Sequence, residues 1–168
     1  MQSYFRFIAA TVIAVTISGC GDQSGDSGAR TESKPVLTAS TLGAQTVLTA
    51  SEYLAAPPYS SADASNGAKL ARICRACHSF DKGGPHMIGP ALYGFFGIEA
   101  GTRDGFEYSS VLANAGFVWT PRALDAWLAQ PGLFLPGNRM TFAGMVQRSE
   151  RDDLIAYLLD VTAVEDGN

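Results

Sequence analysis

The pentapeptide Cys74-Arg75-Ala76-Cys77-His78 constrains this chain more than any other feature of its sequence. Its C-x-x-C-H spacing lets two thiols add to the two vinyl groups of one haem while the adjacent imidazole reaches the iron from the same side. A structural zinc site would need two further ligands, but only one other histidine, His86, and no second cysteine pair are present. A thioredoxin-like pair is expected where a strand runs into a helix, and a plain disulfide would leave the histidine without a role. The motif therefore predicts one covalently bound haem c.

Patterns that start helices recur through residues 63–168. Asp63 or Ser65 can cap a helix that ends near the two cysteines of the motif. Thr120-Pro121 provides an N-cap followed by proline at the first helical position, and Ser149-Glu150-Arg151-Asp152 has the capping-box spacing before an apolar stripe. A shorter helix fits the segment from Ser109 to Ala115. No segment alternates as a strand does, so we expect an all-α fold.

The stretch from Gly83 to Gly105 is too rich in glycine for a long regular element. Four or five short helices joined by such long loops bury too little apolar surface to offset the entropy of ordering them. A large buried cofactor solves this problem. We therefore expect the short helices to wrap around the haem.

The start of the chain has the composition of a targeting segment. An apolar run from Phe7 to Ile17 follows Arg6 and is too short to span a bilayer. It ends in Ile17-Ser18-Gly19-Cys20, which resembles the lipobox of bacterial lipoproteins. We therefore expect residues 1–19 to be a lipoprotein signal peptide and Cys20 to be lipidated. Ordinary cleavage near an unmodified Cys20 is the alternative.

Residues 20–62 are predicted to be a flexible tether, which separates the anchor from a domain at 63–168. Glycine, serine, threonine, alanine and aspartate dominate its first part. The pentapeptide V-L-T-A-S occurs twice, at 36–40 and at 47–51. We interpret this repeat as part of a drifted linker, with a helix or a docking segment as the alternative.

The formal net charge of −4 bears on the class of partner. Because the chain has no basic excess to neutralise phosphates, we expect no nucleic acid among its partners. Three cysteines, of which two lie in one motif, are also too few for a disulfide framework.

The second axial ligand of the iron has to come from the other face of the haem. Met87 and His86 follow His78 too closely, in the loop that must first pack on the histidine side of the ring. Met140 and Met145 both lie far enough along the chain to approach from the opposite face. The residues alone leave these two methionines open as candidates.

Residues from about Gly67 to Val161 resemble a class I cytochrome c of the mitochondrial-like kind. Besides the haem motif, the matching stretches are Gly83-Gly84, Gly89-Pro90-Ala91-Leu92, Gly105-Phe106-Glu107-Tyr108-Ser109, Trp119, Pro136-Gly137-Asn138-Arg139-Met140-Thr141-Phe142 and Glu150-Arg151-Asp152-Asp153-Leu154-Ile155-Ala156-Tyr157-Leu158. The resemblance implies the cytochrome c fold around one haem c. It also selects Met140 as the second ligand and makes Met145 a core residue.

The same resemblance implies roles for the residues around the haem. The Pro90 carbonyl is expected to accept the Nδ1 proton of His78, which orients the ring and raises its basicity. Tyr108 and Trp119 resemble the pair that binds the inner propionate. Asn138 stands where the family has a threonine beside a propionate.

Other positions depart from the family pattern. Ile98 replaces an arginine that is common near the propionate, so we expect that charge to be balanced elsewhere, with Arg103 as the candidate. Trp127 occupies the place of a tyrosine near the methionine. Residues 63–168 contain two lysines, Lys69 and Lys82, whereas mitochondrial relatives surround the haem edge with them.

These observations together predict a monomeric one-electron carrier and not an enzyme, because two protein ligands leave the iron without a position for substrate. Its expected place is the periplasmic, outer face of the cytoplasmic membrane, where the lipid anchor holds it. Its expected partners are respiratory: a terminal oxidase or an upstream quinol-oxidising complex. One alternative is a haem c subunit of a dehydrogenase or reductase complex. Another is a gas sensor with a five-coordinate haem.

Overall fold

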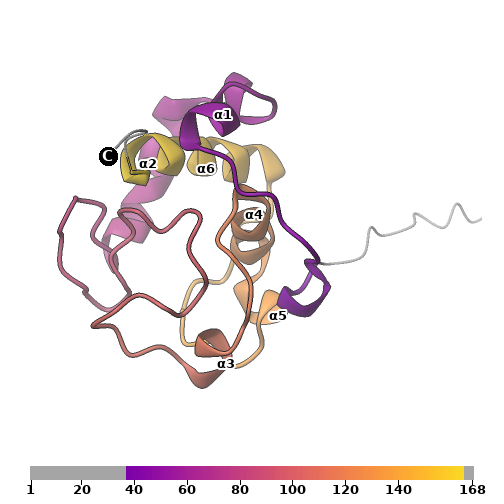
Figure 1. The fold of residues 1–168 in the computed structure, drawn as a ribbon. Helices are drawn as coiled ribbons and strands as arrows, with labels where there is room; N and C mark the ends of the chain where they lie inside the picture. The colour runs from indigo at the N-terminus through magenta and orange to yellow at the C-terminus, as the bar shows by residue number, and fades with distance from the viewer. Residues whose placement is uncertain (1–36, 165–168) are drawn as a thin grey trace, which may run out of the picture. The chain divides into compact units, whose positions relative to one another are not determined.

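The computed structural model describes residues 37–164, which form short helices joined by long loops (Figure 1). The helices are η1 (Ala39–Thr41), α1 (Ala50–Leu54), η2 (Tyr59–Ser61), α2 (Ala64–Arg75), α3 (Ser110–Ala113), α4 (Pro121–Ala129), α5 (Pro131–Phe134) and α6 (Arg148–Thr162), where η marks a 3-10 helix. Within this described part, the pairing of β type is one isolated antiparallel bridge between Glu99 and Val118. The predicted all-α class is therefore confirmed. The signal peptide at 1–19 and Cys20 lie outside the described residues.

Three of the predicted helices start with a side-chain cap, and two of these caps, at Asp63 and Thr120, were predicted. The carboxylate of Asp63 accepts a hydrogen bond from the N–H of Asn66 at the start of α2. Ser109 caps α3 in the same way, and Thr120 caps α4 just before Pro121. Because a cap depends on residues within one turn, these starts follow from local sequence.

The start of α6 differs from the capping-box prediction. The helix begins at Arg148, and its N-cap residue, Gln147, makes no capping hydrogen bond with its side chain. Asp152 forms an ion pair with Arg148, at 3.6 Å between Nε and Oδ2. In a capping box the carboxylate of Asp152 would accept from the backbone N–H of Ser149. It pairs with the side chain of Arg148 on the helix surface, at the (i, i+4) spacing.

Helices α2 and α6 cross in close contact (Figure 1). A Cβ atom at Gly67 would lie 2.2 Å from the carbonyl oxygen of Asp153 and 2.8 Å from the Cβ of Tyr157. Only glycine therefore allows this crossing. Leu154 of α6 is fully buried, and Leu70 and Tyr157 are packed against the core.

The flexible tether predicted for residues 20–62 is contradicted in its second half. Residues 37–62 pack on the domain, and Leu42 is only 2% exposed within the main core. Helices α1 and η2 both contact α6. The physical reason is that these contacts join residues far apart in sequence, so local composition does not reveal them.

The repeated pentapeptide starts a helical turn in both of its copies. Thr38 precedes η1, and its N–H bonds the Oγ1 of Thr41 at 2.9 Å. Thr49 precedes α1, and its N–H bonds the Oε2 of Glu52 at 2.8 Å. The helical alternative for this repeat is therefore the one that the structure has. In the part of the chain that the structure describes, no helix combines the length and apolar character of a membrane span.

Candidate haem site

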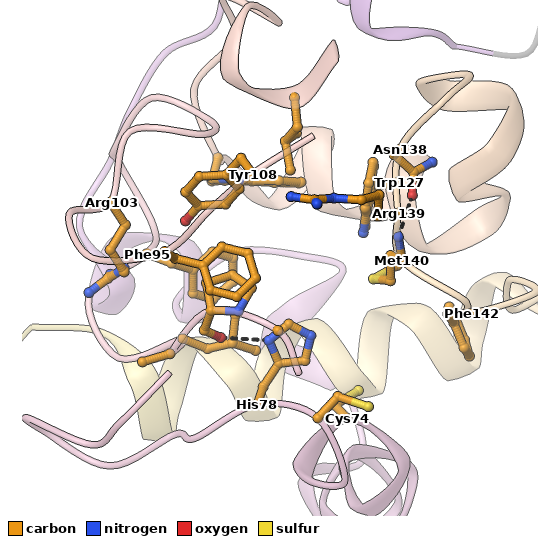
Figure 2. Close-up of a pocket in the computed structure, with 18 of the residues that line it drawn as sticks. Cys74, His78, Phe95, Arg103, Tyr108, Trp127, Asn138, Arg139, Met140 and Phe142 are labelled. Atoms are coloured by element: carbon orange, nitrogen blue, oxygen red, sulfur yellow. Dashed lines mark hydrogen bonds between the residues drawn. The ribbon is translucent and has the colours of Figure 1, made fainter. Parts of the chain in front are cut away.

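The predicted site residues gather around one cavity of about 740 Å³ (Figure 2). Its walls come from the end of α2, the loop that follows it, α4 and the segment around Met140. All eight predicted cofactor-binding residues line it: Cys74, Cys77, His78, Pro90, Tyr108, Trp119, Asn138 and Met140. Most other lining side chains are apolar. A volume of this size lies within the range of about 300–1,000 Å³ usual for cofactor sites.

The cysteines and the histidine are brought together by the turn that follows α2. The backbone N–H of Cys77 and that of His78 both donate to the carbonyl oxygen of Cys74, at 3.0 and 2.9 Å. Burial raises the pKa of the Cys74 thiol to about 11, with a smaller contribution from Cys77. A reactive redox dithiol needs a lowered pKa, so this environment does not support thioredoxin-like chemistry.

One ring nitrogen of His78 forms a hydrogen bond to the protein, and the other is available to bind a metal. Its Nδ1 lies 2.6 Å from the carbonyl oxygen of Pro90, and since a carbonyl can only accept, Nδ1 carries the proton. Burial lowers the pKa of His78, and the hydrogen bond to Pro90 opposes this shift. Gly89 allows the close fit, because a Cβ there would lie 2.3 Å from the Cε1 of His78.

His86 is excluded as an iron ligand by its hydrogen bonds. Its Nδ1 accepts from the N–H of Ala91 at 3.0 Å, so its Nε2 carries the proton, which it donates to the carbonyl of Asp104 at 2.9 Å. No free lone pair remains on either nitrogen. The sequence reached the same result from chain distance alone.

Met140 projects into the cavity from a different segment than His78 (Figure 2). The side chain of Asn138 fixes the turn that presents it: Oδ1 accepts from the N–H of Met140 at 2.9 Å. The two amide hydrogens of Asn138 are donated to the carbonyls of Pro131 and Leu135, each at 2.9 Å. Asn138 therefore acts on the backbone that carries Met140, and its expected contact with a propionate stays a prediction.

Met145 lies in the core and not on the cavity wall. It is 9% exposed, belongs to the main apolar cluster and is tied to α4 by a bond from its N–H to the carbonyl of Leu128, at 2.8 Å. Of the two methionines that the residues left open, only Met140 lines the cavity.

An aromatic wall closes one side of the cavity. The ring of Trp119 makes edge contacts with Phe117 and Trp127, at centroid distances of 4.8 and 5.5 Å. Phe95 lies 6.3 Å from Trp119. Such aromatic contacts bury large apolar areas, so this wall of the cavity is apolar and well packed.

Charged groups line the cavity near Tyr108. Burial raises the pKa of the Tyr108 phenol, while the positive charge of Arg103 acts in the opposite direction. Arg103 donates from Nη2 to the carbonyl of Tyr93 at 2.7 Å. Its predicted role as the counter-charge of a propionate is compatible with this position and stays a prediction.

Sequence reasoning missed Arg139, a second arginine on the cavity wall (Figure 2). It pairs with the carboxylate of Glu107, at 3.6 Å, and also bonds the carbonyl of the same residue. The position of Arg139 directly before Met140 could have indicated that it lies near the cavity. Nothing in the sequence indicated that Glu107 is its partner.

The cavity fits the group that the motif requires. One nitrogen of His78 and the sulfur of Met140 are available as ligands, two thiols stand at the end of α2, and the lining is largely apolar. These features define an all-α protein of the c-type cytochrome class. The haem, when bound, supplies a one-electron iron couple.

Comparison with known proteins agrees with this class. The chain is 46% identical over 98 residues to the cytochrome c homolog of Bradyrhizobium diazoefficiens, a match that covers 58% of this chain and 53%, about half, of that protein. It is 39% identical over 109 residues to cytochrome c of Sesamum indicum, covering 64% of this chain and 96% of the relative. Cytochrome c2 of Blastochloris viridis is 36% identical over 106 residues, covering 63% and 84%. No protein-family model matches the sequence.

The chain belongs to the cytochrome c family, in its class I form. It is therefore an electron-transfer protein and not an enzyme, with one covalently bound haem c as its cofactor.

Proposed function

We propose that this protein is a one-electron carrier whose haem iron is bound by His78 and Met140. The observation that carries the proposal is the shared cavity, into which these two side chains project from segments far apart in sequence. Both are neutral ligands in an apolar pocket, because a thioether carries no charge and an imidazole binds a metal through a nitrogen that is not protonated. Neutral imidazole and thioether favour reduced iron more than two histidines do, so a comparatively high potential is expected.

With His78 and Met140 both bound to the iron, no position would be left there for a substrate. The haem would supply one-electron exchange with partner proteins without bond formation. This is the chemistry of a carrier, and it disfavours the five-coordinate gas sensor.

The ligation is tested by a redox titration of the purified protein followed by visible spectra. We expect a single one-electron transition and a methionine-to-iron charge-transfer band in the oxidised protein. Met140→Ala should abolish this band, while Met87→Leu, at an exposed position, should leave it unchanged. Wild-type protein without the band would contradict the proposed ligation and revive the gas sensor.

We further propose that Cys20 carries a lipid that holds the domain at the outer face of the cytoplasmic membrane. The lipobox-like segment that ends at Cys20 supports this proposal. Tethering would raise the effective concentration of the domain near membrane-bound partners, so that fast transfer needs little affinity. Cys20→Ala should release protein with an unchanged visible spectrum into the soluble fraction. Retention of this variant in the membrane fraction would exclude a lipid anchor at Cys20.

The partners we propose are a terminal oxidase as acceptor and a quinol-oxidising complex as donor. A stable place in a dehydrogenase or reductase complex is the alternative, and co-purification with a larger catalytic subunit would favour it. Among residues 63–168 the lysines number two, Lys69 and Lys82. Together with seven arginines they give nine basic residues against twelve acidic ones, so the formal net charge of this range is −3. We therefore expect no strong long-range attraction to an acidic surface and a transfer rate that depends little on ionic strength.

A further inference from the structure

The segment before α1 touches the wall that carries Trp119. The amide of Gln45 forms two part-buried hydrogen bonds there: Nε2 donates to the carbonyl of Val118 at 3.0 Å, and Oε1 accepts from the hydroxyl of Thr120 at 2.6 Å. These two partners are the residues on either side of Trp119 in the chain. The side chain of Gln45 therefore bonds the carbonyl just before Trp119 and the hydroxyl just after it.

The other edge of the same short segment is fixed by the loop after α2. The N–H of Trp119 bonds the carbonyl of Ile98, and the N–H of Gly97 bonds the carbonyl of Trp119, each at 2.9 Å. Residues 118–120 therefore lie between two neighbours. Gln45 supplies the contact on one edge, and the loop supplies it on the other.

The segment that carries Gln45 is itself anchored. Leu42 is buried in the main core, and its carbonyl accepts a 2.7 Å hydrogen bond from Nη1 of Arg122 in α4. On the other side of Gln45, the Cγ1 of Val47 lies 3.3 Å from the position of a Cβ at Gly97. We call residues 42–47 the brace. In Figure 1 this segment runs from η1 toward α1.

We propose that the brace sets the position of Trp119 in the haem cavity, with Gln45 as the positioning residue, and thereby raises the reduction potential of the haem. The inference rests on the proposed function in one respect, since it requires the haem to occupy this cavity. An amide that holds both sides of Trp119 keeps the aromatic wall closed against water. A drier cavity disfavours the extra positive charge of oxidised iron.

The test compares Gln45→Met with Gln147→Met in the full, haem-loaded chain. Methionine keeps the length of the side chain but removes both hydrogen bonds of Gln45, whereas Gln147 is exposed and makes no side-chain cap. We expect Gln45→Met to shift the reduction equilibrium toward the oxidised form by about three- to tenfold, where tenfold corresponds to about 59 mV for one electron. The control should not shift. Hydrogen exchange of the Gly97 and Trp119 amides should accelerate only in Gln45→Met.

A double-mutant cycle separates positioning from general loosening. If Gln45 acts through Trp119, Gln45→Met should change the potential little in a Trp119→Phe background. A shift of full size in that background, or no shift in the wild-type background, overturns the proposal. Should Gln45→Met fail to load haem, Gln45→Asn replaces it, because the shorter amide adds no charge but cannot reach both Val118 and Thr120; a smaller shift in the same direction is then expected, and none refutes the inference. The wild-type spectrum reports separately on the proposed ligation.

Discussion

Arg151 is a buried charge that joins three parts of the fold. It is 8% exposed, and its Nε lies 2.6 Å from the Oδ1 of Asp125 in α4. From α6 its Nη1 donates to the carbonyls of Met145 and Val146, at 2.7 and 2.9 Å. These carbonyls end the loop that carries Met140. Removing the guanidinium therefore takes the shortest ion pair from the Asp125 carboxylate and a hydrogen bond from each of the two carbonyls.

The expected cost of Arg151→Met follows from these contacts. Breaking a buried ion pair from one side costs about 3–5 kcal/mol. The side chain of Asp125 is 18% exposed, and Arg148 lies 3.9 Å from it. We therefore expect a loss of stability near the lower end of this range. We predict a loss of about 3 kcal/mol in the free energy of unfolding. With a denaturant slope of about 3 kcal/mol/M, the guanidinium chloride midpoint should fall by about 1 M.

The assay is guanidinium chloride unfolding of the haem-loaded protein, followed by circular dichroism in the far ultraviolet. Arg148→Met is the matched control, because this arginine is 60% exposed in its side chain and should contribute about 0–1 kcal/mol. Arg151→Met combined with Asp125→Leu should recover part of the loss, because no unpaired charge remains. A loss below about 1 kcal/mol in the single variant, or no recovery in the double variant, would refute the reasoning.

Three further perturbations test other parts of the structure. Burial raises the pKa of Asp152, so its charge costs folding free energy once the pH rises through that raised value; Asp152→Asn should stabilise the protein at pH 7, and thermal unfolding should show this gain vanishing below about pH 4. Gly67→Ala gains about 1 kcal/mol of helix propensity, but its Cβ would meet the Asp153 carbonyl at 2.2 Å, so urea unfolding should show a net loss of about 1–2 kcal/mol; a more stable variant would contradict the tight crossing. Asn138→Leu removes the bond to the N–H of Met140, and the methionine band should disappear at a lower temperature than in the wild type while the far-ultraviolet signal persists.

Local sequence predicted the parts of the fold that depend on neighbouring residues. The predicted caps at Asp63 and Thr120 each involve an N–H three residues away, and the structure has both. The haem motif likewise places both cysteines and the histidine within one turn. The short helix α5 was not predicted, because Pro131-Gly132 signals a chain break more strongly than a helix start.

The packed segment before residue 63 could not be predicted in the same way. Its bond from Thr120 to Gln45 spans 75 residues, and its composition is that of a linker. The buried Leu42 is a lone apolar residue among small polar ones, with no period to mark it. Such contacts become visible only when both partners are placed in space.

The loops around the haem cavity lack regular secondary structure, so their backbone groups need other partners. Side chains supply them: His78 bonds the carbonyl of Pro90 in its own loop, Asn138 bonds the carbonyls of Pro131 and Leu135, and Arg151 bonds those that end the loop after Met140. Gln45 does the same for the segment at Trp119. Substitutions at these four positions remove bonds to backbone or side-chain groups that line the cavity or lie next to its walls in the chain. They should therefore change the iron's ligation or potential more than they change overall helicity, in contrast to Gly67, whose close contact joins two helices.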